Sequence, residues 1–91
     1  MVKGVIIAED SLLPVQSRMA RAALGWSLDA LAARCGVSRR AILRFEQGES
    51  LPRGRTLIAI RRAFEAAGLR FIDEGEFAGG VAPTRPSEEK G

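Results

Sequence analysis

The chain has 91 residues, a net charge of +3 and a single cysteine. This length fits one small domain with short tails, and we expect no room for a separate ligand-binding domain. One cysteine excludes a disulfide framework within the chain, and the lack of histidine excludes a His-based catalytic triad and the usual zinc sites.

Positive charge is concentrated in the middle of the chain. Residues 18–62 contain ten arginines and three acidic residues, a net charge of +7, whereas residues 65–91 carry a net charge of −3. A basic segment attracts polyanions, chiefly because counterions are released from a phosphate backbone. A solvated helix surface is the alternative, but the local excess of arginine favours nucleic acid.

The N-terminal arm, residues 1–13, contains a short apolar run from Val5 to Ala8. Its β-branched residues are compatible with a short strand, and a disordered tail is the alternative. The arm has no basic region followed by a long apolar run, and no stretch of the chain approaches the ~20 apolar residues of a membrane span. A cytoplasmic location is therefore expected.

A first helix is predicted from Pro14 to Leu24. Proline suits the first helical turn because its missing N–H is not needed there, and Gly25 ends the helix. The apolar pattern predicts the following inward-facing residues: Val15, Met19, Ala22 or Ala23, and Leu24.

Two short helices joined by a tight turn are predicted between Ser27 and Gly48. Each begins after a serine whose hydroxyl can cap free amide groups, Ser27 and Ser38, and Gly36 permits the left-handed backbone of a sharp turn. The residues that face inward on these two helices are Leu28, Leu31, Ala32, Cys35, Ala41, Ile42 and Phe45.

The outward face of the second helix carries three arginines, Arg39, Arg40 and Arg44. Because the connection is too short for antiparallel packing, the second helix is expected to project from the body of the domain. A projecting helix with arginines near its N-terminal end suits the major groove of DNA.

With these residues the chain resembles the helix-turn-helix family of phage repressors and Cro-type regulators (the XRE type). The resemblance covers about Met19 to Leu69, and its most specific parts are the LAxxxGVS run from Leu31 to Ser38 and the ExG ending, Glu46 to Gly48. It implies a mainly α-helical fold, a compact four-helix domain like that of phage lambda repressor, and sequence-specific binding to double-stranded DNA.

The resemblance also implies roles for individual residues. Base edges would be read by Arg39, Arg40 and Arg44, since the paired donors of arginine fit the O6 and N7 acceptors of guanine. The candidate contacts to phosphate are Ser27, Ser38, Gln47, Arg53 and Arg55.

Two further positions bear on the resemblance. It implies a structural ion pair between Arg21 and Glu46 that joins the first helix to the third. At one position the chain departs from the family pattern: Leu28 stands where the family often has a glutamine that touches the DNA backbone. A changed docking angle and a protein partner at that surface both stay open.

A fourth helix is predicted from Leu57 to Ala67, capped by Thr56, and it completes a helix-turn-helix domain over residues 14–68. Its wide apolar stripe ends at Gly68.

Residues 69–82 are predicted to form a short β extension, with a strand from Arg70 to about Asp73 and a weaker returning strand near Val81. Because a lone hairpin is marginally stable in water, this extension is a candidate dimer contact. Residues 83–91 are expected to be a disordered tail.

The function favoured by these observations is transcriptional regulation, as a repressor or as an activator that contacts RNA polymerase. A homodimer on a pseudo-palindromic operator is expected, since two half-sites about 34 Å apart specify a genomic position better than one. The alternatives are a DNA-binding antitoxin, whose acidic C-terminal tail would bind its toxin, and a helix-turn-helix protein-interaction module.

We expect no enzymatic activity, cofactor or metal. The acidic pairs Glu9–Asp10, Asp73–Glu74 and Glu88–Glu89 consist of neighbouring residues, whose side chains point apart. The segment GEFAGG lacks the lysine and the strand-to-helix context of a phosphate-binding loop.

Overall fold

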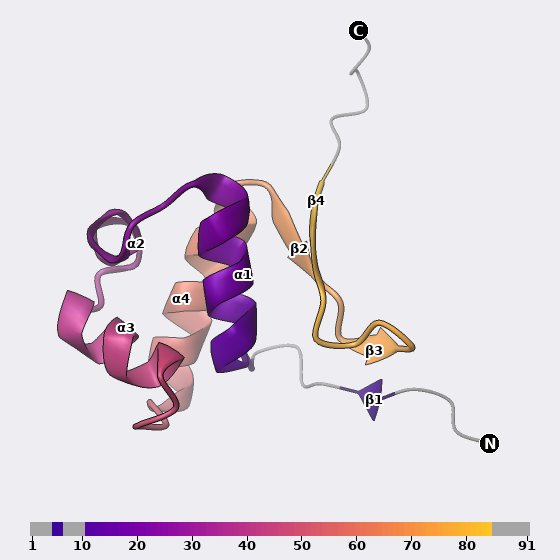
Figure 1. The fold of residues 1–91 in the computed structure, drawn as a ribbon, viewed down its shortest axis with the longest axis horizontal. Coiled ribbons are helices and arrows are strands. Elements are labelled where there is room, and N and C mark those ends of the chain that lie inside the picture. The colour runs from indigo at the N-terminus through magenta and orange to yellow at the C-terminus, as the bar shows by residue number, and fades with distance from the viewer. Residues whose placement is uncertain (1–4, 7–10, 85–91) are drawn as a thin grey trace, which may run out of the picture.

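The computed structural model describes residues 5–6 and 11–84, and these residues form four helices and four short strands (Figure 1). The helices are α1 (Pro14–Leu24), α2 (Leu28–Cys35), α3 (Arg39–Glu46) and α4 (Gly54–Ala66). The strands are β1 (Val5–Ile6), β2 (Leu69–Phe71), β3 (Glu74–Gly75) and β4 (Val81–Pro83). The predicted fold class, a mainly α-helical domain with a short C-terminal β-hairpin, is confirmed.

Helix α1 has the predicted bounds, but the prediction of its inward face is wrong. The structure exposes Val15 and Met19, which were expected in the core, and both Ala22 and Ala23, of which one was expected there. Gln16, Ser17 and Ala20 are buried instead, and Leu24 packs at the edge of the core as expected. Burial of this polar face is compensated in part by hydrogen bonds, since the Ser17 hydroxyl donates to Glu46 and the Gln16 Oε1 accepts from the Leu13 N–H.

The predicted pair of short helices is present as α2 and α3. The Ser27 hydroxyl accepts a hydrogen bond from the Ala30 N–H at 3.0 Å, and the Ser38 hydroxyl accepts one from the Ala41 N–H at 3.1 Å. Gly36 ends α2 with a φ of +75°, a left-handed conformation that costs other residues energy. Local capping therefore sets the turn between the two helices.

Helix α4 begins three residues earlier than predicted, and Thr56 is not its cap. The Arg53 carbonyl accepts the first-turn hydrogen bonds from the Thr56 and Leu57 N–H groups, at 2.9 and 3.1 Å. Gly54 lies in the first turn, since glycine also adopts helical dihedrals.

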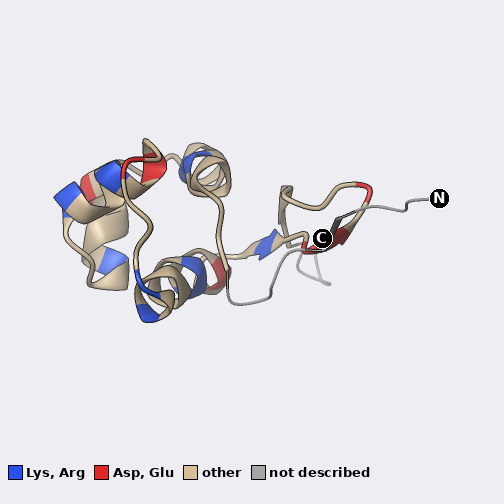
Figure 2. Cartoon of the chain, turned by 90° about the horizontal axis from the view of Figure 1, so that it is seen from below, with Lys and Arg blue, Asp and Glu red and all other residues tan. Residues whose placement is uncertain are grey.

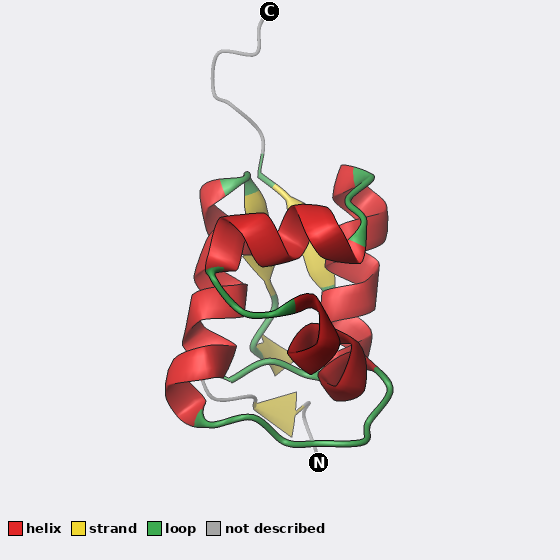
Figure 3. Ribbon diagram, turned by 90° about the vertical axis from the view of Figure 1, so that its left-hand side faces the viewer, coloured by secondary structure: helices red, strands yellow, loops and turns green. Residues whose placement is uncertain are grey.

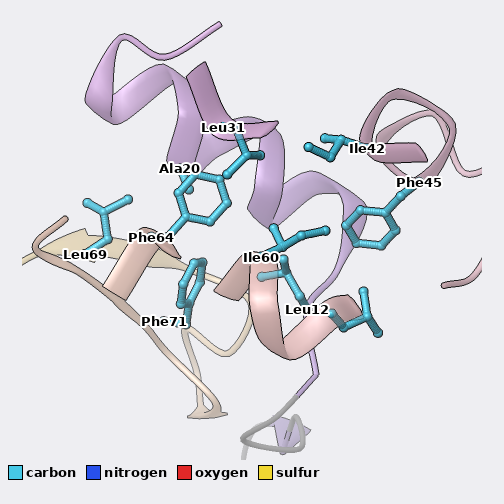
Figure 4. Close-up of a cluster of buried hydrophobic side chains, with 10 residues drawn as sticks. Leu12, Ala20, Leu31, Ile42, Phe45, Ile60, Phe64, Leu69 and Phe71 are labelled. Carbon is cyan, nitrogen blue, oxygen red and sulfur yellow. The ribbon is translucent and has the colours of Figure 1, made fainter. Parts of the chain in front are cut away.

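The hydrophobic core joins all four helices to the hairpin (Figure 4). Its ten buried members are Leu12, Ala20, Leu31, Ile42, Phe45, Leu57, Ile60, Phe64, Leu69 and Phe71. Phe64 is central, since its ring stacks on Trp26 with centroids 5.7 Å apart and meets the edge of Phe71 at 6.0 Å. The hairpin thus belongs to the core and is stabilised by aromatic packing.

Strands β2 and β4 pair antiparallel, with Leu69 opposite Pro83 and Phe71 opposite Val81. The returning strand is where it was predicted, but β2 spans Leu69–Phe71 and does not reach Asp73. Pro83 also lies in β4 and not in the predicted tail. Thr84, also within the predicted tail, donates to the Gly68 carbonyl from its N–H and its hydroxyl. Residues 85–91 of that tail lie outside the described residues, as do residues 7–8 of the predicted N-terminal strand.

The hairpin lies on the far side of the molecule from α3. Figure 3 is turned so that α2 and α3 face the viewer, and the strands appear behind the helices. Strands β1 and β3 form a second antiparallel pair in which Val5 is opposite Gly75. The β extension therefore leaves the surface of α3 uncovered.

Arg61 attaches the extension to the helices, and sequence analysis gave it no role. Only 6% exposed, it donates hydrogen bonds to the Asp73 carboxylate at 2.8 and 3.1 Å, to Glu65 at 3.0 Å and to the Ser11 carbonyl at 3.0 Å. Its guanidinium also lies 5.1 Å from the centroid of the Phe71 ring. Burial lowers the pKa of Arg61, but the hydrogen bonds and charges of Asp73 and Glu65 together raise it above its ordinary value.

Candidate nucleic-acid interface

Helix α3 combines a buried apolar face with an exposed basic face. Ile42 and Phe45 are 0% and 1% exposed, whereas Arg39, Arg40 and Arg44 all face solvent. The 3.6-residue period of the helix separates the two faces, so burial of the apolar residues directs the arginines outward. Figure 1 shows α3 at one end of the molecule, beside α2 and away from the hairpin.

The three arginines differ in their partners. The Arg39 Nε lies 3.4 Å from an Asp29 carboxylate oxygen, which joins the start of α3 to the first turn of α2. Within the described part of the chain, Arg40 and Arg44 form no ion pair. Both guanidinium groups are therefore available to a polyanion.

The proposed phosphate contacts lie at the ends of α2 and α3 and at the start of α4. Gln47 is the exposed C-terminal cap of α3, and Arg53 and Arg55 are exposed at the start of α4. Ser27 and Ser38 use a hydroxyl lone pair for capping, which leaves each O–H able to donate. Figure 2 shows that most of the basic residues lie on the helices, whereas the β extension carries acidic ones.

Arg21 and Glu46 form the ion pair that the resemblance implied. Glu46 is 2% exposed, and its carboxylate accepts hydrogen bonds from Arg21 Nη2 at 2.6 Å and Nε at 2.9 Å. The hydrogen bond with Glu46 raises the pKa of Arg21 above its ordinary value. The pair fixes the C-terminal end of α3 against α1 and so sets the direction in which α3 presents its arginines.

Two further side chains of α1 complete this network, and sequence analysis missed both. The Ser17 hydroxyl donates to the Glu46 carboxylate at 2.6 Å, and Arg18 donates to the Glu46 backbone carbonyl. Ser17 is fully buried, and no pattern in the sequence indicated this. These hydrogen bonds explain why α1 turns a polar face inward.

Several arginines of the basic segment are not part of the interface. Arg21 and Arg61 are engaged inside the protein, and the Arg34 guanidinium lies 4.4 Å from the centroid of the Trp26 ring. The net charge of +7 over residues 18–62 already counts Glu46 against Arg21, but it leaves out Glu65 and Asp73, the acidic partners of Arg61. The free charge is concentrated on α3 and at the start of α4.

A family model described as Helix-turn-helix (HTH_3) matches residues 18–67. The chain belongs to the helix-turn-helix family. The match confirms the resemblance to XRE-type regulators and identifies this helix-turn-helix protein as a DNA-binding regulator. It runs from within α1 to the end of α4, so the β extension lies outside the matched region. No curated protein matches the chain.

The described residues of the helix-turn-helix protein include neither a membrane-spanning helix nor a metal-binding group. Among them, no helix combines the length and apolar character needed to cross a bilayer. The same residues contain no group of three or more Cys, Asp or Glu side chains placed to hold a metal ion.

Proposed function

We propose that this helix-turn-helix protein is a transcriptional repressor that binds a pseudo-palindromic operator as a homodimer. The observation that carries the proposal is the exposed arginine face of α3, Arg39, Arg40 and Arg44, on a helix whose opposite face is buried. Placed in the major groove, such a face offers paired donors to the O6 and N7 atoms of guanine. The bound dimer would repress by excluding RNA polymerase from the promoter.

Contacts outside α3 would fix the register of the protein on DNA. Arg53, Arg55 and Gln47 follow α3 directly and are exposed, so they are placed to meet the phosphates that flank the groove. The capped N-termini at Ser27 and Ser38 add donors with favourable dipoles. These contacts supply affinity that is independent of base sequence.

A selection experiment tests DNA recognition. Purified protein is used to enrich a random double-stranded oligonucleotide pool, and affinity for the enriched site is measured by fluorescence anisotropy. The double variant Arg40→Ala/Arg44→Ala is compared with Arg62→Ala/Arg70→Ala, which also removes two exposed arginines. We expect the first variant to lose at least about 30-fold in affinity, since two base contacts contribute about 1 kcal/mol or more each.

The control variant should lose affinity only a few-fold, because Arg62 and Arg70 lie outside the interface. Equal losses for the two variants would contradict the assignment of α3 as the reading helix. Protection mapping of the DNA upstream of the gene, with the triple variant of Arg39, Arg40 and Arg44, then locates the operator.

The subunit contact is proposed to involve the β extension. Both edges of the β2–β4 ladder are unsuited to pairing with a second copy. Hydrogen-bonded and non-hydrogen-bonded residue pairs alternate along an antiparallel ladder, and the hydrogen bonds on either side of Arg70–Ala82 make this pair a hydrogen-bonded one. The backbone of Pro83, in the next pair, therefore faces the free edge of β4, where it has no N–H to donate. On β2, symmetric pairing would set exposed Arg70 against its own copy.

We therefore place the contact at Phe77, which is 70% exposed in the turn between β3 and β4. Burial of this ring in both subunits would stabilise the dimer by about 3 kcal/mol or more. Sedimentation of Phe77→Glu should show a dimer dissociation constant at least about 100-fold higher than that of wild type. The control is Leu51→Glu, at an 85% exposed residue of the α3–α4 loop. An equal effect of both variants would show that Phe77 is not the subunit contact.

The antitoxin alternative depends on the acidic tail within residues 83–91. Residues 85–91 lie outside the described part of the chain. No feature of the described residues favours that function over regulation.

A further inference from the structure

An exposed ion pair links the two helices of the motif. Asp29 belongs to the first turn of α2 and Arg39 is the first residue of α3, with 3.4 Å between a carboxylate oxygen and Nε. The side chains are 81% and 56% exposed, respectively, so water screens the attraction and the pair adds little to folding stability. Its position within the proposed interface indicates a different role.

Asp29 places a negative charge within the proposed DNA interface, where a negative charge lowers the affinity for DNA. It follows Ser27, the cap of an α2 N-terminus proposed to meet phosphate, and Leu28, which has no polar group to offer. A carboxylate at this position repels phosphate and opposes non-specific binding, which is largely electrostatic. The repulsion is weakest when Arg39 neutralises the carboxylate.

The contact uses one particular nitrogen of Arg39. Asp29 approaches Nε, at 3.4 Å, and the two terminal nitrogens of the guanidinium make no hydrogen bond within the described residues. Those two nitrogens form the fork that fits guanine O6 and N7. The attraction at Nε, although screened by water, also favours the rotamers of Arg39 in which the fork is directed away from Asp29.

We propose that Asp29 is a specificity-determining residue that positions Arg39 for one guanine and penalises binding elsewhere. The inference rests on the proposed function, since it concerns the same DNA site. Asp29 itself touches no base, and it acts through the direction of Arg39 and through repulsion of phosphate.

The test compares Asp29→Asn with Glu49→Gln, which neutralises an exposed acidic residue after α3 that forms no ion pair in the described chain. Affinities are measured for the selected site, for every single-base variant of it and for unrelated DNA. We expect Asp29→Asn to bind unrelated DNA several-fold more tightly and to lose about tenfold discrimination at one guanine position. Glu49→Gln should leave discrimination unchanged at all positions.

A double-mutant cycle separates positioning from net charge. In an Arg39→Ala background, Asp29→Asn should no longer change base discrimination, whereas Asp29→Glu in the wild-type background should retain most of it. If Asp29→Asn keeps the wild-type base preference at every position, the inference is wrong and the proposed function stands. If the wild-type protein enriches no DNA sequence, both fail.

Discussion

Removal of the Arg21 guanidinium tests whether the buried carboxylate of Glu46 depends on it. In Arg21→Ala, Glu46 keeps only the Ser17 hydroxyl as a donor to its carboxylate. The Glu46 side chain is 3% exposed, so water replaces the three lost hydrogen bonds only in part. The comparison variant is Arg18→Ala, which removes a neighbouring arginine from the same network.

The size of the effect follows from burial. Breaking a buried ion pair by removal of one partner costs about 3–5 kcal/mol. The Arg21 side chain is 22% exposed, so water enters part of the space it vacates, and we expect about 3 kcal/mol. Arg18→Ala removes one part-buried hydrogen bond from an exposed side chain to the Glu46 backbone carbonyl, and we expect less than about 1 kcal/mol.

Thermal unfolding followed by circular dichroism measures the difference. For a domain of this size, 1 kcal/mol shifts Tm by about 4–8 °C, so Arg21→Ala should melt about 12–24 °C below wild type and Arg18→Ala only a few degrees below. Equal melting temperatures for the two variants would show that Glu46 does not depend on Arg21. Restoration of stability by the double variant Arg21→Ala/Glu46→Ala, relative to Arg21→Ala, would support a stranded charge as the cause.

Three further predictions concern the backbone, the β extension and the thiol. Gly36→Ala should cost about 1–2 kcal/mol because φ is +75° there, whereas Gly54→Ala, helical and free of contacts, should be neutral or stabilising in chemical denaturation. Arg61→Ala should destabilise by about 2–4 kcal/mol through loss of its buried ion pairs, whereas Arg62→Ala should stay within about 0.5 kcal/mol, and equal effects would refute the role of the buried arginine. Burial raises the pKa of the Cys35 thiol above its ordinary value of 9.0, so its alkylation should be slow in the native state. Its contribution to stability should be present below pH 9.0 and lost as pH rises through the higher native pKa, and a flat difference between Cys35→Ala and wild type across that range would contradict this.

The position of the reading helix was predictable because its determinants are local. The serine caps and Gly36 act on backbone groups within a few residues, and helical periodicity separates Ile42 and Phe45 from the arginines. Such interactions are contained in a contiguous stretch of sequence. The hairpin was also found, since its alternating residues and glycine-rich turn are local signals.

Tertiary structure decided three features: the inward face of α1, the role of Arg61 and the contact of Asp29 with Arg39. Ser17 is buried because Glu46 accepts its hydrogen bond across 29 positions of sequence, and Arg61 is buried because it reaches the Ser11 carbonyl across 50. Whether a polar side chain can leave water depends on the partners it meets, and distant segments supply those partners. The sequence by itself therefore determined the helices, the turn and the outward arginines of α3, while folding alone determined which polar groups hold them in place.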